Sequence, residues 1–417
     1  MALRVIRVEL EPDASELARR LFDRAGVVQA RAEEGSVTYL ACDPVECRDH
    51  LDPEPTLLRQ RSSLGETPRW FGMLPYEALR DAEGGLASDG RPAPLVSEPL
   101  WLRYDAVIRV GRSVEIVCES ESAGEKLLKL LQRPARPSQT ELRLRSAPEP
   151  SEQHVARVRT ALEQIASGNI YEVNLARRFE LSVRGSAADL LAAFERAGAM
   201  PHSFSLEHAG LQVVAVSPEL CLRLDPDGTL VTRPIKGTRP RHPDPVEDQR
   251  LARELELDPK ERAELTMIVD VERNDMSRVA ELGSVHLSEP PHVVALPGLH
   301  HRVATVAARV PAELSRARLF AEVLPSGSVT GAPKRRAMQL IRELEPHRRG
   351  LYTGVVGVIR HDGGAELKMA IRTLTVRDGV GHYFSGGGIV SDSVPEREVE
   401  ETLWKARRLL ELAANGA

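Results

Sequence analysis

Apolar residues recur along this chain at two different spacings, and both become clearer after about residue 150. Val155, Val158, Leu162 and Ile165 follow the helical repeat, and Gly168 stands where such a helix would end. Other apolar runs have the length and character of strands. The clearest of them are residues 170–181, 211–224 with a break at Ser217-Pro218, 351–360, 366–376 and 381–390. Many strands with turn residues between them, and helices inserted irregularly, favour an α+β fold over an alternating parallel sheet.

A segment rich in Pro, Ser, Arg and Glu, residues 132–153, interrupts these patterns and predicts a linker or a long connection. Before it lie strand-like runs at residues 36–44 and 113–120 and a helical run at residues 16–26. The interruption divides the chain into two regions, residues 1–145 and residues 150–417.

Composition excludes several classes of protein. Apolar residues make up 42% of the chain and the net charge is −5, which indicates a globular protein without the basic field of a nucleic-acid-binding protein. The N-terminus lacks the pattern of a signal peptide, and no run is apolar enough to span a bilayer. Since the four cysteines form neither a C-x-x-C pair nor a zinc spacing, we expect reduced thiols, a cytoplasmic protein, and neither nucleic acid nor membrane as a partner.

The first of two predicted helices with spaced carboxylates covers residues 257–275. Asp258 is a candidate N-cap and Pro259 a candidate first residue. Glu261 stands where a capping box has its acid, and Glu264 follows three residues later on the same face. The alternatives are a helix-start acid for Glu261 and a solvated surface acid for Glu264.

The second helix, within residues 391–413, repeats the pattern. Ser393 or its neighbour is expected to cap it, Pro395 opens it, and Glu398 and Glu401 follow with Lys405 one turn beyond. The alternative is a charged exterior face with pairs four residues apart. If the four glutamates of the two helices face one another, they need a cation between them, and all-oxygen ligands suit Mg²⁺.

Further candidates have both structural and functional interpretations. Gly387 and Gly388 permit either close approach of a ligand or a bulge. Arg372, in a predicted strand, needs a carboxylate partner from a ligand or from a neighbouring acid. His301 is interpreted as a core or surface histidine in a helix, and Tyr352 as a packed aromatic side chain.

The stretch "RPIKGTRPR", residues 233–241, is the least ordinary. It holds Lys236 inside a constrained turn, with Arg233 and Arg239 on either side. A desolvated amine next to two guanidinium groups is expected to have a lowered pKa, and this would make it a nucleophile.

Taken together, several motifs resemble component I of the chorismate-utilising enzymes. The motifs lie in the order in which the family has them and cover most of residues 151–410, with a looser match at residues 69–80; they are residues 168–179, 217–224, 233–241, 260–279, 324–359, 371–374 and 386–406. The resemblance implies a large sandwich of two antiparallel β-sheets covered by helices, with strands of the N-terminal region in the same sandwich.

The resemblance also implies an Mg²⁺ ion on the ring carboxylate of chorismate. Glu264 and Glu401 would be direct ligands, and Glu261 and Glu398 inner or water-mediated partners. The remaining positions implied to be near chorismate are Arg372 and Tyr352 at the enolpyruvyl carboxylate, Gly387, Gly388 and Lys405 along the ring carboxylate, and Ser328 and His301 near the departing and arriving substituents.

Within the family, Lys236 resembles the lysine of aminodeoxychorismate synthases, where anthranilate synthases usually have alanine. This implies that Lys236 attacks C2 of chorismate while Glu219 protonates the leaving C4 hydroxyl. Ammonia would then attack C4 and expel the lysine. The chain has no glutaminase motif, so ammonia would come from a separate glutaminase subunit or from solution.

Two alternatives stand beside this hypothesis: an anthranilate synthase component I with an atypical lysine, and a catalytically inactive homologue with a regulatory role. Glu172 stands where isochorismate and salicylate enzymes carry a water-activating lysine and aminodeoxychorismate synthases more often have glutamine. The sequence leaves open whether Glu172 faces the site. The "LLES" motif of tryptophan-regulated anthranilate synthases is missing from the N-terminal region.

Overall fold

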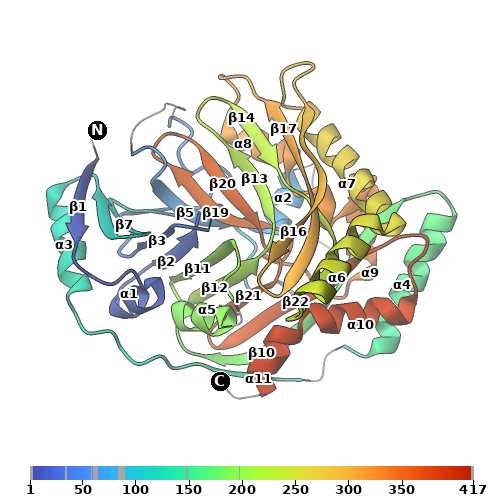
Figure 1. Cartoon of the computed structure of the whole chain (residues 1–417), viewed down its shortest axis with the longest axis horizontal. Coiled ribbons are helices and arrows are strands. Elements are labelled where there is room, and N and C mark those ends of the chain that lie inside the picture. Colours follow the sequence, from blue (N-terminus) through green and yellow to red (C-terminus); the bar gives the residue numbers. More distant parts are fainter. Residues whose placement is uncertain are drawn as a thin grey trace.

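A computed structural model of the protein describes residues 3–32, 35–57, 59, 64–82, 90–146, 149–196 and 198–414. Two antiparallel β-sheets form the body (Figure 1). The apolar cluster between them draws on both sheets, for example Val28 and Phe204 from one and Phe71 and Val356 from the other. This confirms the predicted sandwich. Among the described residues, no helix is long and apolar enough to cross a membrane.

The larger sheet holds strands from both halves of the sequence, in an order that is not the order of the chain. From edge to edge it runs β1 (Arg4–Val8), β8 (Val114–Cys118), β7 (Ala106–Val110), β3 (Thr38–Ala41), β2 (Val27–Arg31), β11 (His202–His208), β12 (Leu211–Ser217), β21 (Thr373–Arg377), β22 (Val380–Ile389), β10 (Glu172–Arg184) and β18 (Gly331–Ala332), with β9 (Glu141–Leu144) also on β10.

The smaller sheet carries the second set of strands. Its order is β15 (Ile235–Pro240), β17 (Leu299–Arg309), β14 (Thr229–Thr232), β13 (Leu220–Leu224), β20 (Ala365–Met369), β19 (Val355–Arg360), β5 (Pro68–Leu74), β6 (Leu100–Arg103) and β4 (Glu46–Arg48), with β16 (His286–Leu296) also on β17.

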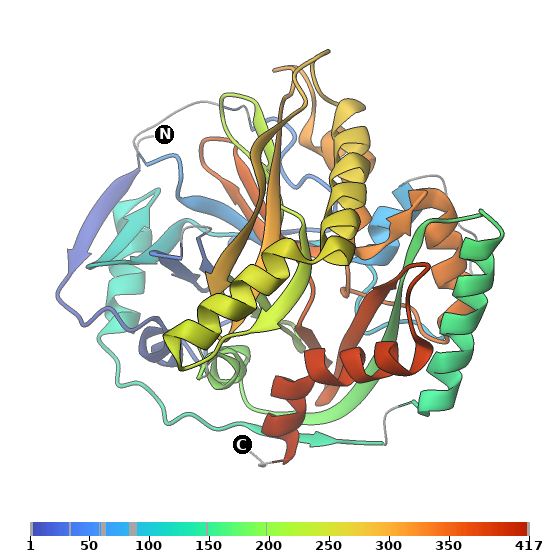
Figure 2. The same ribbon diagram turned by 45° about the vertical axis from the view of Figure 1, so that its right-hand side comes forward.

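Helices lie on the outside of the sandwich, and α6 and α7 run beside β16 and β17 while α10 lies next to α4 (Figures 1 and 2). The helices are α1 (Ala14–Arg20), α2 (Tyr76–Ala82), α3 (Glu121–Leu131), α4 (Ser151–Ala166), α5 (Ala187–Glu195), α6 (Pro245–Leu257), α7 (Pro259–Ser277), α8 (Arg316–Val323), the 3₁₀ turn η1 (Gly327–Val329), α9 (Lys334–Leu344), α10 (Pro395–Lys405) and α11 (Arg407–Ala414).

The predicted connection at residues 132–153 crosses the outside of the body, and residues 147 and 148 lie outside the described part. Its strand β9 pairs with β10, and Arg136 forms an ion pair of 2.6 Å with the buried Asp189. Each sheet contains strands from both sides of the connection, as two adjacent groups that pair directly, β2 with β11 in the larger sheet and β5 with β19 in the smaller one. The connection is therefore part of the sandwich.

The caps of the two glutamate-bearing helices differ from each other. Asp258 accepts hydrogen bonds from the backbone N–H groups of Lys260 and Glu261, and Pro259 opens α7, as predicted. In contrast, the residue before Pro395 is Val394, which has no capping side chain, and the Ser393 hydroxyl accepts the N–H of Val390 instead. The N-cap is therefore the neighbour of Ser393, as one of the two expectations had it, but without a capping side chain.

Two predicted elements, one strand and one helix, also need correction. The run 366–376 is not one strand, because it breaks after Met369 and continues in the other sheet from Thr373. Arg372 lies in the break with a φ of 49°, which is an uncommon left-handed conformation for a residue other than glycine. His301 lies in strand β17 and not in a helix, since its neighbours pair with β15 and β16 along the whole run.

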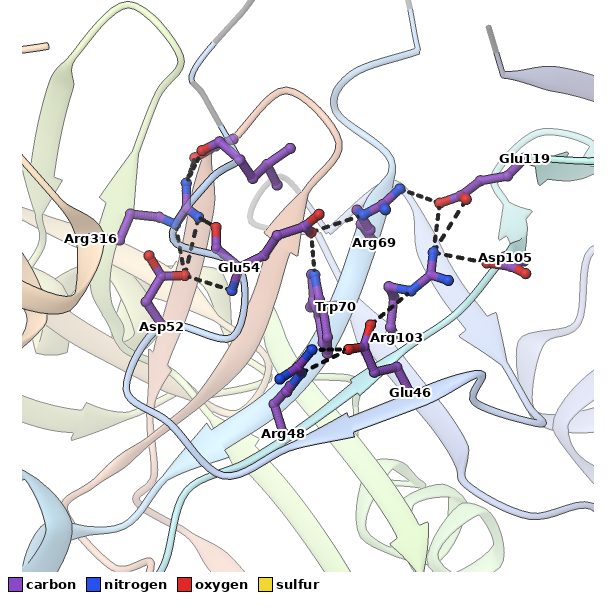
Figure 3. Close-up of polar contacts among 12 residues, drawn as sticks. Glu46, Arg48, Asp52, Glu54, Arg69, Trp70, Arg103, Asp105, Glu119 and Arg316 are labelled. Atoms are coloured by element: carbon purple, nitrogen blue, oxygen red, sulfur yellow. Dashed lines mark hydrogen bonds and ion pairs between the residues drawn. The ribbon is translucent and has the colours of Figure 1, made fainter. Parts of the chain in front are cut away.

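A network of ion pairs ties the N-terminal strands to α8 (Figure 3). Arg316 donates to Asp52 at 3.1 Å and to backbone carbonyl groups, and Arg69 reaches both Glu54 and Glu119. Both Arg316 and Asp52 are buried. Their charges are therefore compensated inside the protein.

Candidate active site

A cavity of about 630 Å³ opens between the end of the smaller sheet, α7, α10 and β22. It brings together residues that are far apart in the sequence. The predicted residues that line it are Glu219, Lys236, Glu261, Glu264, His301, Ser328, Tyr352, Arg372, Gly388, Glu398, Glu401 and Lys405. Gly387 is not itself a lining residue, but it lies next to one, since a Cβ atom on it would be 3.0 Å from Oε1 of Glu401.

Lys236 reaches the cavity from β15, and its Nζ lies 2.6 Å from Oε1 of Glu172 on β10. Both side chains are buried. Gly388 of β22 is pressed against the pair, because a Cβ there would lie 2.2 Å from Glu172 Oε1 and 3.2 Å from Lys236 Nζ. Glycine is therefore the residue that this close approach allows. The structure also answers the open question about Glu172: it is not itself a lining residue of the cavity, but its carboxylate contacts the lining residue Lys236.

The expected lowering of the Lys236 pKa was wrong. Burial acts to lower this pKa, but the charge of Glu172 and its hydrogen bond outweigh burial, and the pKa is raised. The two arginines of the motif turn elsewhere: Arg239 pairs with Asp258 at 2.8 Å, and the Arg233 side chain donates to the Thr305 hydroxyl. Sequence proximity therefore misidentified the nearest charge, which comes from another sheet.

Glu219 lies at the loop between β12 and β13, where it is buried and lines the cavity. The hydroxyl of Ser328 donates to its Oε1 at 2.7 Å. Burial raises the pKa of Glu219 to about 7, against the opposing effect of the Ser328 hydrogen bond. A carboxyl group that titrates near neutral pH can both give and accept a proton.

The four glutamates of α7 and α10, which we call the glutamate wall, are Glu261, Glu264, Glu398 and Glu401. On α7, Glu261 approaches Arg239 at 3.4 Å, and Glu264 is 3.7 Å from the half-exposed Lys260. Burial raises the pKa of Glu264 to about 7. Its charge is therefore only weakly compensated by the protein.

On α10, burial raises the pKa of Glu398. Glu401 differs, because the Lys405 ammonium at 2.6 Å overcomes the effect of burial and lowers the Glu401 pKa. Gly387 faces both carboxylates, since a Cβ atom on it would lie 3.0 Å from Glu401 and 3.4 Å from Glu398. Because glycine has no Cβ atom, the backbone of β22 at Gly387 can lie close to these two carboxylates of the glutamate wall.

The donor set of the glutamate wall fits Mg²⁺ in its chemistry, because it offers only carboxylate oxygens and includes a poorly compensated one. Among the described residues, no three carboxylate, imidazole or thiol groups already stand together as a ready-made metal site. A hard cation that keeps several waters and takes few protein ligands is compatible with both findings.

Arg372 is a further cation that lines the cavity. Within the described part of the chain, no carboxylate pairs with it, so the ordinary alternative of a salt bridge to a neighbouring acid is wrong. Burial lowers its pKa. A half-buried guanidinium in a left-handed backbone conformation is costly, and an anionic ligand would compensate it.

Two aromatic side chains also line the cavity. The ring of Tyr352 stacks on that of Phe384 with centroids 5.3 Å apart. The guanidinium carbon of Arg349 also lies over the Tyr352 ring, 5.4 Å from its centroid. Tyr352 is thus a packed aromatic side chain, as expected, and it also lines the cavity.

His301 presents its ring to the cavity from β17. Its Nδ1 lies 3.0 Å from the Thr238 hydroxyl and 3.3 Å from the carbonyl oxygen of Gly237, while Nε2 is buried without a protein partner among the described residues. Burial, together with the charge of Arg372, lowers the His301 pKa to about 3. The imidazole is therefore neutral at physiological pH.

Sequence reasoning missed some residues of the cavity. Asn174 lines it, and its Oδ1 is buried without a protein partner in the described part of the chain. Asn174 and Glu172 lie two residues apart on β10, so strand alternation puts both on one face. That alternation was the available signal. Tyr383 also lines the cavity, and burial raises its pKa to about 12.

Comparison with known proteins identifies the relatives of this chain. The chorismate binding enzyme family model matches residues 14–411. Anthranilate synthase component 1 of Streptomyces coelicolor is 36% identical over 375 residues, which are 81% of this chain and 71% of that protein. Aminodeoxychorismate synthase component 1 of Escherichia coli is 41% identical over 259 residues, 62% of this chain and 57% of that protein. The corresponding protein of Salmonella typhimurium is 36% identical over 369 residues, 87% of this chain and 78% of that protein.

Solved structures agree on the fold. Anthranilate synthase component I of Streptococcus pneumoniae superposes with a TM-score of 0.75 at 25% identity, covering 97% of this chain and 91% of that one. The menaquinone-specific isochorismate synthase of Escherichia coli gives 0.78 at 21% identity, covering 99% and 95%.

Proposed function

The chain belongs to the chorismate-binding enzyme family, and we propose that it is an aminodeoxychorismate synthase component I. It converts chorismate and ammonia to 4-amino-4-deoxychorismate, which leads to 4-aminobenzoate and folate. The observation that carries this proposal is the buried amine of Lys236 in the same cavity as the proton-exchanging Glu219.

The reaction starts with Lys236 as an ammonium group held 2.6 Å from Glu172. Glu172 accepts a proton and leaves a neutral amine, which forms a bond to C2 of chorismate while the bond from C4 to the hydroxyl oxygen breaks. Glu219 supplies the proton with which that hydroxyl leaves as water. Because Glu172 neutralises the lysine charge before this step, the raised pKa of Lys236 is compatible with a nucleophilic role.

Ammonia then forms a bond to C4, and the bond between C2 and the lysine nitrogen breaks. This restores Lys236, and Glu219 takes back a proton from the new C4 nitrogen. His301, neutral because burial keeps its pKa near 3, lies where it can accept or donate a hydrogen bond to the exchanging substituents together with Ser328.

Substrate binding divides between two charged sides of the cavity. Arg372 and Tyr352 hold the enolpyruvyl carboxylate, and the ring carboxylate lies along Gly387, Gly388 and Lys405. Glu264 and Glu401 would be the direct ligands of Mg²⁺, with Glu261 and Glu398 as water-mediated partners. When bound, Mg²⁺ would orient the ring carboxylate and offset its charge.

The ammonia source is proposed to be a separate glutaminase chain. Support comes from the relatives, whose names mark them as component 1 of their enzymes, and from the lack of a glutaminase motif in this sequence. Free ammonium at high concentration would replace that chain in an assay.

Anthranilate synthesis is the second candidate, because relatives with that name are as similar as the aminodeoxychorismate synthases; the Thermus thermophilus protein is 44% identical over 259 residues. Purified protein should be incubated with chorismate, Mg²⁺ and an ammonium salt. A product that aminodeoxychorismate lyase converts to 4-aminobenzoate is expected. Fluorescent anthranilate with release of pyruvate would contradict the first proposal and support the second, and no turnover would contradict both.

The contribution of Glu172 is tested separately by Glu172→Gln. The amide can still accept a hydrogen bond from Lys236 but cannot take its proton, so turnover should fall roughly 10²-fold or more, the usual scale for loss of proton transfer. Unchanged turnover would remove Glu172 from the proton transfer but leave the product assignment intact.

A further inference from the structure

Behind Glu219, away from the cavity, lies a second buried carboxyl group that the proposed reaction does not use. Glu272 of α7 is 1% exposed and points toward η1. Two serines of that turn lie between the two acids. The Ser328 hydroxyl is 2.7 Å from Glu219, the two serine oxygens are 3.0 Å apart, and Ser326 is 2.5 Å from Glu272 Oε1.

The packing of η1 against α7 holds this row of oxygens in place. A Cβ atom on Gly327 would lie 2.3 Å from Cγ1 of Val271, so a larger residue would push the turn away from the helix. The hydroxyl of Ser326 also accepts the backbone N–H of Ser328. The row is therefore short, buried and fixed at both ends.

Counting hydrogens along the row indicates how many protons it holds. If both acids are ionised, each serine donates to its own carboxylate, and no hydrogen lies between the two serine oxygens. If Glu272 is protonated, it donates to Ser326, Ser326 donates to Ser328, and Ser328 donates to the ionised Glu219. If Glu219 is protonated, the same three hydrogen bonds run in the reverse direction. One proton thus satisfies every contact in a single direction, and either acid can hold it.

The surrounding charges favour this state. Around Glu219 stand the Ser328 hydroxyl and the ammonium groups of Lys236 and Lys405 at longer range. Around Glu272 stand Asp275, Lys334, and the hydroxyl of Thr232 at 3.3 Å. Because Lys334 is paired with Asp275 at 2.6 Å, its positive charge is largely compensated by that carboxylate and stabilises an ionised Glu272 only weakly. Burial and the neighbouring Asp275 raise the pKa of Glu272, so two negative charges in this row are disfavoured.

We propose that Glu219 and Glu272 share one proton through Ser326 and Ser328, and that Glu272 keeps Glu219 supplied with the proton that the reaction consumes. This rests on the proposed function, in which Glu219 protonates the departing hydroxyl. Glu272 is a positioning residue, since it acts on the substrate only through Glu219.

The transfer balances without another reactant. The O–H bond of Glu272 breaks as Ser326 receives a proton, Ser326 passes its own proton to Ser328, and Ser328 passes its own to Glu219. Both hydroxyl groups end intact with reversed orientation, Glu272 becomes a carboxylate, and Glu219 becomes an acid. The proton that Glu219 later takes from the incoming nitrogen returns along the same row.

Infrared difference spectroscopy of the substrate-free protein tests the sharing directly. The spectra of the wild type and of each single variant, Glu219→Gln and Glu272→Gln, are compared with the spectrum of the double variant at neutral pH. A shared proton predicts that the wild type shows less protonated-carboxyl intensity than the two single variants added together, because one proton satisfies the whole row when both acids are present. If the wild-type intensity equals the sum of the two single-variant intensities, each acid holds its proton independently and the proposal is overturned.

Turnover tests the supply of the proton. Ser326→Ala cuts the row but keeps both acids, and turnover is expected to fall roughly 10-fold or more, with a weaker dependence on deuterated solvent. The matched control is Thr232→Val, which removes a hydroxyl from the other oxygen of Glu272 and should leave turnover within about twofold. Wild-type turnover in Ser326→Ala would overturn the supply role. Since the infrared test needs no substrate, it can succeed or fail whichever product the enzyme makes.

Discussion

The ion-pair network of the N-terminal strands (Figure 3) and the cavity of the C-terminal region differ in how closely their charged side chains are paired. In the network, Arg103 contacts both Asp105, at 2.9 Å, and Glu119, at 3.2 Å. In the cavity, Glu264 has its nearest ammonium group at 3.7 Å, and Arg372 has no carboxylate partner in the described part of the chain.

Burial alone does not distinguish the two regions, because it raises the pKa of Glu119 in the network as well. The partners distinguish them. In the network, each of these charges has an opposite charge of the protein next to it. In the cavity, Lys236 and Glu401 are paired as well, but one group of each sign, Glu264 and Arg372, is left weakly compensated. Uncompensated charge is a better indicator of a binding site than burial.

The largest expected effect is on turnover. Lys236→Ala removes the proposed nucleophile and should lower formation of aminodeoxychorismate by about 10³-fold or more, measured as 4-aminobenzoate in the lyase-coupled assay. The matched control is Lys260→Ala, which removes a half-exposed ammonium from the same cavity and should have a much smaller effect. Equal losses in the two variants would mean that the cavity needs positive charge and not a nucleophile.

The next effect concerns the network. Asp52→Ala leaves the buried guanidinium of Arg316 without its carboxylate partner and should destabilise the protein by about 3–5 kcal/mol, the usual loss when one member of a buried pair is removed. The thermal unfolding midpoint would fall, while turnover of the folded enzyme below that temperature stays the same. A loss of turnover without a loss of stability would link the network to the site and erase the contrast between the regions.

Glu264→Gln tests the weakly compensated carboxylate of the cavity, as Asp52→Ala tests the paired carboxylate of the network. In the metal-free protein the folded-state pKa of Glu264 is about 7 against an ordinary 4.5, so folding favours its protonated form. Its contribution to stability is therefore lost as pH rises through this range and is absent above it. The variant should show a smaller fall of the unfolding midpoint between acidic and mildly alkaline pH, together with a weaker Mg²⁺ dependence of turnover. An unaltered Mg²⁺ titration would contradict the ligand assignment.

The smallest effect is expected at an exposed pair. Arg4 and Glu121 lie 2.6 Å apart, but their side chains are 60% and 70% exposed. Arg4→Gln should change the free energy of unfolding by about 1 kcal/mol or less, since solvent screens such pairs. A change as large as that of Asp52→Ala would show that exposure is a poor guide to the value of an ion pair in this protein.

Much of the architecture follows from local patterns that can be identified in the sequence. Asp258 and Pro259 fix the start of α7, and the three-residue spacing of its glutamates sets them on one helical face. The long apolar runs around β10, β12, β19 and β22 are strands in the structure. These features depend on neighbours in the chain, and periodicity reports them well.

The errors share a different origin. Histidines, valines and alanines around His301 suit either a helix or a strand, and only pairing with β15 and β16 decides for the strand. The run through Arg372 is continuous in the sequence but leaves one sheet for the other in space. Neither outcome is recorded in local spacing, because the strand at His301 depends on pairing with other strands and the break at Arg372 depends on the second sheet.

By itself, the sequence determined the family, the two glutamate-bearing helices and the identity of the amine in the motif at residues 233–241. Only the tertiary structure decided which charge stands beside that amine, because Glu172 arrives from the other sheet and raises a pKa that the neighbouring arginines were expected to lower. It also decided that Glu219 is joined to Glu272 through two serines. Electrostatic interactions depend on the distance between charges in space, and the separation of two residues along the chain does not predict that distance.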